Sequence, residues 1–305
     1  MSKPLKRKLG PAMTALLALS VLLFYVLENK DDLFSFKKQA VIPPEGNCTV
    51  TFLDVGQGDS TLISCGGTHV LIDAGESNRG ADVVLALRRL GVRQLDYVIG
   101  THAHSDHIGG LDTVINEIPT KRIILADLSD NVVPDTRSYI DLLEAMVNNS
   151  VELIPARVGA QYSVGEATLT LLGPVRTDYS SLNDWSIVAR LSFGKTAFLF
   201  TGDAEEKAES DLLDAGLDVS ATVLKLGHHG SKSSSSMRFL KAVAPEYAVI
   251  EVGQNNKYGH PSAQTLENLM NLRITVYRTD LDGCITAVSD GKRVTFTVEK
   301  QKEAA

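Results

Sequence analysis

The feature that most constrains this chain is a cluster of potential metal ligands directly after a predicted buried strand. The apolar stretch at residues 96–101 is typical of a strand, and the segment HAHSDHIGG follows it at residues 102–110. Imidazole and carboxylate groups are ligands that suit zinc and related divalent ions. A lone histidine is more often a surface or core residue, but this joint pattern predicts two metal sites. His102 and His104 would face one ion, and Asp106 and His107 would face a second.

Apolar segments rich in β-forming residues alternate with amphipathic segments along the chain. We expect strands at residues 49–54, 60–65, 69–73, 96–101, 122–125, 167–172, 187–193, 196–200, 221–226, 247–252, 274–277 and 293–298. We expect helices at residues 81–90, 138–147, 204–213, 237–243 and 263–272, with a further helix starting after residue 110. Gly91 and Gly216 are expected as C-terminal caps. This order of elements predicts stacked sheets covered by helices.

The N-terminal segment has the layout of a membrane anchor. Basic residues at 1–9 precede an uncharged apolar stretch at residues 10–27, and charged residues follow it. As a helix, this stretch would reach roughly 27 Å at about 1.5 Å per residue, near the minimum for crossing a bilayer. Basic residues before the span favour a cytoplasmic N-terminus, so the remainder would lie outside the cytoplasm, tethered to the cell membrane by a single pass. A cleaved signal peptide is the alternative, although no small-x-small site follows the span.

Composition sets the limits of the folded part. Residues 28–47 are charged and then rich in proline and glycine, so we expect a linker there, a folded domain at residues 48–300 and a short tail at residues 301–305. The formal net charge of −7 argues against a strongly basic nucleic-acid surface, although bound metals would add positive charge. The three cysteines are too few for a disulfide scaffold. Cys48 and Cys65 flank a predicted hairpin, but their positions are offset by about two residues from direct opposition. Both alternatives, a disulfide between them and free thiols, therefore stay open.

Three further motifs resemble those of the metallo-β-lactamase superfamily. Asp73 lies in the segment HVLIDAG, Asp203 ends FTGD, and His228 and His229 lie in LKLGHHG. The resemblance implies an α/β fold, an αββα four-layer sandwich, which the predicted transmembrane helix would precede. It also implies that Asp73 orients the ligand loop, that Asp203 bridges two metals, and that His228, the first histidine after its strand, is the last ligand. His229 is then expected behind the ligands.

Within that superfamily the chain looks most like the soluble domain of the DNA-uptake competence protein ComEC and its stand-alone relatives. The resemblance rests on LDVGQGDS at residues 53–60, LNDWSIV at 182–188, HHGS at 228–231 and YGHP at 258–261. One short span cannot build a DNA pore, so we expect the channel-forming segments of ComEC to have no counterpart in these residues. Many superfamily members also carry a further histidine for the first metal, but residues 108–227 contain none. Residues 183–186 occupy its place, so one metal would have fewer protein ligands.

The resemblance implies two divalent ions, zinc or manganese, that bridge a hydroxide nucleophile. In this scheme the first ion is held by His102 and His104, and Asp203 is shared. The second is held by Asp106, His107 and His228, with Asp106 also counted as catalytic. His260 is expected to contact substrate or to donate a proton to the leaving group, with Lys257 as a possible helper. A turn or helix-start role for that loop is the alternative, because Pro261 and Ser262 suit it.

The resemblance to ComEC implies a phosphodiesterase or nuclease, and the predicted anchor implies that it acts outside the cytoplasm. Its substrate would be a nucleic acid or a phosphorylated wall or lipid component, and its other partner the membrane; no protein partner is predicted. An amide or thioester hydrolase of the same fold is one alternative, and a non-catalytic metal-binding factor of DNA uptake is another. Trp185 has two interpretations, stacking on a base or packing in the core.

Overall fold

Two β-sheets face each other in the structure, a computed structural model that describes residues 46–128 and 133–300. The larger sheet has the strand order β15-β14-β1-β2-β3-β4-β5-β6. Its strands are β1 Cys48–Phe52, β2 Thr61–Cys65, β3 Thr68–Ile72, β4 Leu95–Gly100, β5 Thr120–Leu125, β6 Glu152–Pro155, β14 Ile285–Ser289 and β15 Val294–Val298. Strands β3 to β6 run parallel, so their carboxyl ends lie at one edge of the sheet.

The smaller sheet has the order β13-β12-β11-β10-β9-β8-β7. Its strands are β7 Gln161–Val164, β8 Ala167–Leu171, β9 Ala189–Phe193, β10 Thr196–Phe200, β11 Val223–Lys225, β12 Tyr247–Ile250 and β13 Thr275–Arg278. Strands β10 to β13 are parallel, whereas β7 to β10 pair in antiparallel fashion. Both sheets therefore combine an antiparallel part with a parallel part.

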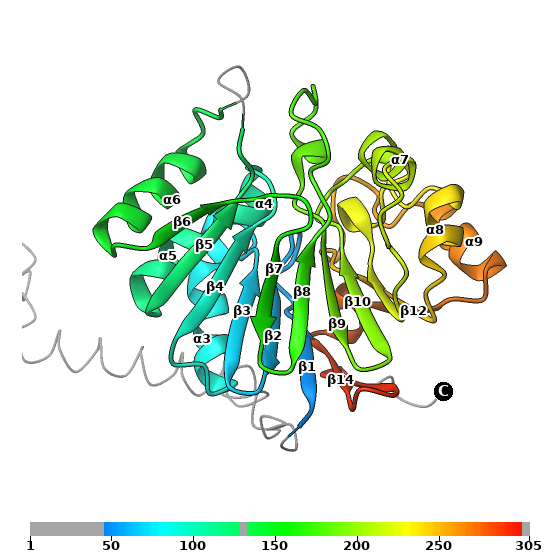
Figure 1. Cartoon of the computed structure of the whole chain (residues 1–305), viewed down its shortest axis with the longest axis horizontal. Helices are drawn as coiled ribbons and strands as arrows, with labels where there is room; N and C mark the ends of the chain where they lie inside the picture. Colours follow the sequence, from blue (N-terminus) through cyan, green and yellow to red (C-terminus); the bar gives the residue numbers. More distant parts are fainter. Residues whose placement is uncertain (1–45, 129–132, 301–305) are drawn as a thin grey trace, which may run out of the picture. The chain divides into compact units, whose positions relative to one another are not determined.

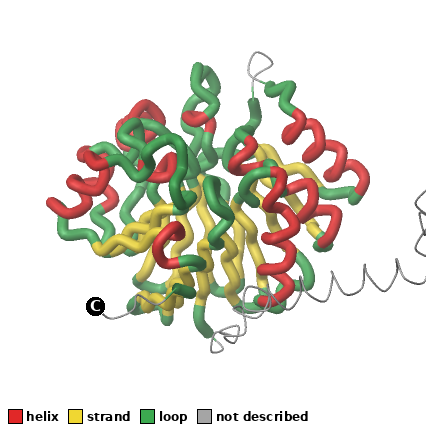
Figure 2. Tube along the Cα trace, turned by 180° about the vertical axis from the view of Figure 1, so that it is seen from behind, coloured by secondary structure: helices red, strands yellow, loops and turns green. Residues whose placement is uncertain are grey.

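Helices cover the outer face of each sheet (Figure 1). On the larger sheet they are α3 Gly80–Arg89, α4 Ser105–Ile108, α5 Leu111–Glu117 and α6 Arg137–Asn148. On the smaller sheet they are α7 Glu206–Asp214, α8 Met237–Val243 and α9 Ala263–Asn271, and a short α10 Thr279–Asp282 follows β13. The view from behind shows the strands between two groups of helices (Figure 2). The predicted αββα sandwich is confirmed.

Strand β10 illustrates why the sheets stack. Every residue of its sequence TAFLF is buried, because side chains alternate between two apolar layers. Phe198 and Phe200 belong to the core between the sheets, where Phe200 lies 6.4 Å from Phe52 of the opposite sheet, centroid to centroid. Ala197 and Leu199 belong to the core under α7, α8 and α9. A strand that is apolar on both faces must lie between two layers.

The predicted elements match the structure closely. All twelve predicted strands and all five bounded helices occur, with ends within two residues of the predicted ones, and α5 follows residue 110 as expected. Gly91 and Gly216 have positive φ and end α3 and α7, as predicted. Strands β6, β7 and β14 were missed. The first two are sheet edges with mostly exposed or polar residues, so apolar periodicity does not mark them.

The β1–β2 pairing corrects the prediction about the two cysteines that flank this hairpin. Cys48 and Cys65 are direct partners in the β1–β2 register, so the predicted offset of two residues is wrong, and both are buried free thiols.

The predicted anchor at residues 10–27, most of the linker and the tail lie outside the described residues. In the described ranges, every helix is too short or too polar to cross a bilayer.

Candidate metal centre

The predicted ligands meet where the parallel strands of the two sheets end. Asp73 follows β3, and the segment at residues 102–107 follows β4. Asp203 follows β10 of the other sheet, and His228 and His229 follow β11. Ligands on loops at the carboxyl ends of neighbouring strands can converge although they are far apart in sequence. The sandwich thus brings all of these predicted residues into one cluster.

Asp203 lies at the centre of this cluster and is buried, with 2% of its surface exposed. Its Oδ1 is 3.1 Å from Nε2 of His107. Its Oδ2 is 3.9 Å from Nε2 of His102, 3.7 Å from Nε2 of His228 and 3.8 Å from Nε2 of His229. One carboxylate therefore faces the Nε2 atoms of four histidines. This is the arrangement expected of a carboxylate shared by two ions.

Asp73 contacts His107 at Nδ1, the ring nitrogen that does not face Asp203. Its Oδ2 lies 2.9 Å from His107 Nδ1, while Thr101 donates its backbone N–H to Oδ1 at 2.8 Å and its hydroxyl to Oδ2 at 2.6 Å. With Nδ1 so engaged, His107 turns Nε2 towards Asp203. The structure thus places Asp73 where an orienting residue is expected.

The histidines that open the ligand loop lie against each other, and His102 also faces Asp203. Nε2 of His102 lies 3.0 Å from Nδ1 of His104, and Nδ1 of His102 is near the hydroxyls of Thr101 and Ser186. His102 is buried, whereas His104 is half-buried. The predicted pair for the first ion is thus brought together.

The two adjacent histidines of the 3₁₀ turn Gly227–Gly230 have different surroundings. His229 is buried, donates from Nδ1 to the Glu251 carbonyl at 2.9 Å, and brings Nε2 to 3.3 Å from Asp106 Oδ2. The His228 side chain is 26% exposed, and its Nδ1 lies 3.3 Å from Glu205 Oε1. The structure therefore places His229, and not His228, beside Asp106. Both residues have a positive φ, so their order along the chain is no guide to which side chain turns inward.

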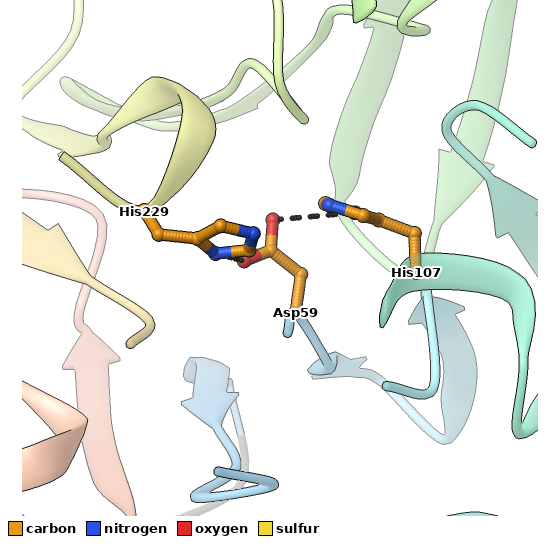
Figure 3. Close-up of side chains that lie close together, drawn as sticks. All are labelled: Asp59, His107 and His229. Atoms are coloured by element: carbon orange, nitrogen blue, oxygen red, sulfur yellow. Dashed lines mark ion pairs between the residues drawn. The ribbon is translucent and has the colours of Figure 1, made fainter. Parts of the chain in front are cut away.

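Sequence reasoning gave no role to three buried charged residues at this site. Asp59, in the loop between β1 and β2, places Oδ1 at 3.2 Å from His229 Nδ1 and Oδ2 at 3.6 Å from His107 Nδ1 (Figure 3). Lys225 forms a close ion pair with Asp59. Glu251 accepts hydrogen bonds from the backbone of Ser60 and the hydroxyl of Thr61. The available signals were the motif LDVGQGDS and a lysine inside an otherwise apolar strand.

Among the residues that the structure describes, two groups of side chains have ligand atoms close enough together to hold an ion: His102, His107 and Asp203, and Asp59, His107 and His229. In the first group His107 Nε2 and Asp203 Oδ1 are buried and make no hydrogen bond within the described residues, so an ion would satisfy both. In the second group Asp59 is already paired with the Lys225 ammonium, which would repel a cation. The residues around Asp203 therefore fit divalent metals, and Asp59 fits a supporting position.

Electrostatics support this fit. Burial alone would lower the pKa of His107, but the carboxylates of Asp203, Asp59 and Asp73 raise it well above its usual value. Burial likewise opposes protonation of His229, yet Asp203, Asp106 and Asp59 raise its pKa to about 10. By contrast, burial lowers the pKa of His102 well below its usual value. In the absence of metal, the crowded carboxylates thus draw protons onto histidines, so the site favours cations.

Comparison with known proteins identifies the family. The sequence profile of the metallo-beta-lactamase superfamily matches residues 53–253. The chain belongs to the metallo-β-lactamase superfamily. This fold implies divalent metal ions, and the described cluster supplies His and Asp groups able to bind them.

Relatives within the superfamily include proteins of bacterial competence. The chain is 30% identical over 269 residues to ComE operon protein 3 of Bacillus subtilis. The aligned region covers 82% of this chain and 34% of that protein. It is 33% identical over 255 residues to Competence protein ComA of Neisseria gonorrhoeae, with 82% and 33% covered. The predicted resemblance to the ComEC group is confirmed. The chain spans about a third of the length of these relatives.

Solved structures share the superfamily fold at low sequence identity. Igni18, a metallo hydrolase from the archaeon Ignicoccus hospitalis, aligns with a TM-score of 0.50 and 17% identity over 78% of this chain and 98% of that one. A mutant of the CmlA β-hydroxylase aligns with a TM-score of 0.53 and 14% identity over 80% of this chain and 54% of that one. These matches bear on the fold alone.

Residues 183–186, which the sequence resemblance places where many superfamily members carry a further histidine, lie beside the candidate ligands. Ser186 Oγ accepts the Asp203 backbone N–H at 2.9 Å and is 3.3 Å from His102 Nδ1. Asn183 Nδ2 lies 3.4 Å from His228 Nδ1, and its Oδ1 is buried without a hydrogen bond from described residues. Trp185 is 1% exposed and donates to the Tyr179 carbonyl at 3.0 Å, so the core interpretation is confirmed.

His260 lies beside this metallo-β-lactamase site, outside the group of ligands around Asp203. Its ring centroid is 5.5 Å from that of His228, and its buried Nδ1 makes no hydrogen bond with any described residue. Asn256 fixes the loop by bonding both the N–H and the carbonyl of His260. Ser262 caps α9 by accepting the Thr265 N–H, so the predicted helix-start role belongs to Ser262, while the His260 ring stacks on Tyr258. Lys257 Nζ lies over the Tyr258 ring, 5.1 Å from its centroid.

Proposed function

We propose that this metallo-β-lactamase-fold hydrolase cleaves phosphodiester bonds with two divalent ions, zinc or manganese. The observation that carries the proposal is the Asp203 carboxylate, which is buried and faces the Nε2 atoms of four histidines. A shared carboxylate between two imidazole-rich positions is suited to a two-metal hydrolytic site. The likeness to competence proteins over 82% of the chain supports a nucleic acid as the substrate.

The proposed roles keep the division of ligands predicted from the sequence, with one change. His102 and His104 hold the first ion, and Asp106, His107 and His229 hold the second. His229 replaces the sequence assignment of His228, because His229 is the one that reaches Asp106. Divalent ions held there supply Lewis-acid polarisation and activation of water at neutral pH.

The open side of Asp203 is proposed to receive the substrate. His228 is partly exposed there, and Glu205, Asn183 and Ser233 surround its Nδ1. His260, with its unbonded Nδ1, is proposed to contact the substrate or to donate a proton to the leaving group. These polar groups suit a charged substrate better than an apolar one.

The substrate class is tested with the full purified chain on bis-nitrophenyl phosphate, single-stranded DNA and nitrocefin, with zinc or manganese added after chelation. We expect metal-dependent cleavage of the two phosphodiester substrates and none of nitrocefin. The chelated protein is the control. Nitrocefin turnover without phosphodiester cleavage would support an amide-type hydrolase instead. Tight metal binding with no turnover of any substrate would support a binding factor.

We further propose that residues 10–27 anchor the chain in the cell membrane, with the catalytic domain outside the cytoplasm. The support is the basic flank before an uncharged apolar stretch. Protease added to intact spheroplasts should then degrade the domain without prior lysis of the cells. Protection of the domain until lysis would contradict this orientation.

A further inference from the structure

Asp59 lies behind the metal centre and faces two of the proposed ligands at once. Its side chain is 4% exposed, and its two oxygens approach Nδ1 of His229 and Nδ1 of His107 from between the rings (Figure 3). The Nε2 atoms of the same rings lie 3.8 and 3.1 Å from Asp203. Asp59 and Asp203 therefore lie at opposite nitrogens of both imidazoles.

This placement bears on the tautomer of each ring. A neutral imidazole that offers Nε2 to a metal carries its proton on Nδ1, and a carboxylate at Nδ1 favours that form. His107 Nδ1 also contacts Asp73, and His229 Nδ1 also contacts the Glu251 carbonyl. Asp59 differs from these two groups because it faces both rings, so it links the geometry of one ligand to that of the other.

The loop that carries Asp59 is packed tightly under the ligand loop. Asp59 donates its backbone N–H to the Asp106 carbonyl at 3.0 Å, and its carbonyl accepts the Gly75 N–H at 2.8 Å. A Cβ at Gly58 would clash with the Asp106 carbonyl oxygen, so the neighbouring residue must be glycine for this approach. The backbone thus fixes where the Asp59 carboxylate can lie.

Lys225 completes the arrangement. This residue of β11 has a side chain only 2% exposed, forms a close ion pair with Asp59, and donates to the Gly202 carbonyl at 3.1 Å. Gly202 directly precedes Asp203. A buried ammonium is costly unless it is paired, so Lys225 and Asp59 depend on each other. The Lys225 ammonium beside Asp59 also opposes direct binding of a cation to that carboxylate.

We propose that Asp59 and Lys225 are positioning residues that hold His107 and His229 as Nε2 ligands, and that the Asp59 carboxylate strengthens metal binding through both rings. This inference rests on the proposed two-metal function. If the pair served stability alone, Asp59 would matter only because Lys225 needs a counter-charge. The two possibilities predict different behaviour when both charges are removed together.

The experiment measures zinc affinity of the full chain by competition with a chromophoric chelator, and the melting temperature of the metal-free protein. The variants are Asp59→Asn and the charge-balanced double variant Asp59→Asn with Lys225→Met. Asp54→Asn is the matched control, because Asp54 lies on the same loop but pairs with Lys300 near the surface, 3.1 Å away.

We expect Asp59→Asn and the double variant each to lose about 10- to 100-fold in zinc affinity, the usual range for a group behind a metal ligand. Asp54→Asn should bind like the parent. The double variant should melt at a higher temperature than Asp59→Asn, because it has no unpaired ammonium. Parental affinity in the double variant, or in Asp59→Asn, would overturn the inference. A parent chain that binds no zinc or manganese would overturn the proposed function as well.

Discussion

The histidines around Asp203 form a buried, closed side and a partly exposed, open side. On the closed side, His107 and His229 are fully buried, and Asp59, Asp73 and the Glu251 carbonyl engage their Nδ1 atoms. On the open side, His104 and His228 are partly exposed, and Asn183 and His260 have buried polar atoms without hydrogen bonds from described residues. Preorganised ligands bind metal tightly, whereas groups left unbonded are free to meet a substrate. We therefore expect the closed side to bind its metal more tightly, and the open side, which also carries the proposed ligand His104, to receive the substrate.

The largest effect is expected at the residue that the two sides share. Asp203→Ala should reduce hydrolysis to the uncatalysed background and lower the bound metal, because a methyl group cannot hold two ions together. Elemental analysis and kinetics on the folded variant check this. Asp214→Asn, an exposed aspartate on α7 paired with Arg238, is the control. Retention of both ions and full activity in Asp203→Ala would refute its central role.

Substitution of the neighbouring histidines His228 and His229 tests the difference between the two sides directly. His229→Ala should remove the tighter of two bound ions, while His228→Ala should keep that ion and lose turnover. Zinc titration after chelation should also show two unequal sites in the parent, since the open side has fewer buried ligands. Equal affinity at the two sites, or loss of the tight ion in His228→Ala alone, would reverse the assignment.

Substitution of His260 tests the catalytic role proposed for the open side separately from metal binding. His260→Ala should lower turnover by about 10²- to 10⁴-fold, the usual range for a general acid or base, and leave the metal content unchanged. Steady-state kinetics and elemental analysis of the same preparation are the measurements. Metal loss in this variant would place His260 among the ligands.

The smallest effect concerns Glu209, which supports the loop of the open side. Burial raises the pKa of Glu209 to about 7 from its usual 4.5, against the pull of the Ser235 and Ser236 amides that it accepts. The folded state then favours the protonated acid, so its contribution to stability is full below about pH 4.5 and is lost as the pH rises through about 7, on the order of 3 kcal/mol in all.

Thermal melts of the metal-free chain from pH 5 to pH 8 test this sign. Glu209→Gln cannot ionise, so the parent should lose stability relative to this variant across that range. An unchanged difference between the two proteins from pH 5 to pH 8 would mean that Glu209 titrates alike in the folded and unfolded states.

Much of the fold was predictable because its signals are local. Strands such as β10 are apolar over their whole length, and α3 and α7 end at glycines with positive φ. Edge strands β6 and β7 escaped prediction because an edge requires less apolar surface. The interleaved pairing of β1 with β14, far apart in sequence, has no local signal at all.

For the site, the sequence by itself determined which ligand types follow which strands, and parallel strands then bring those ends together for a general geometric reason. Only the tertiary structure decided that His229 turns inward beside Asp106, because left-handed backbone at both histidines breaks the link between chain order and side-chain direction. The tertiary structure also paired Asp59 with Lys225 across 166 residues. Such a pair forms because neither charge can be buried alone, and each must find its partner through the fold rather than along the chain.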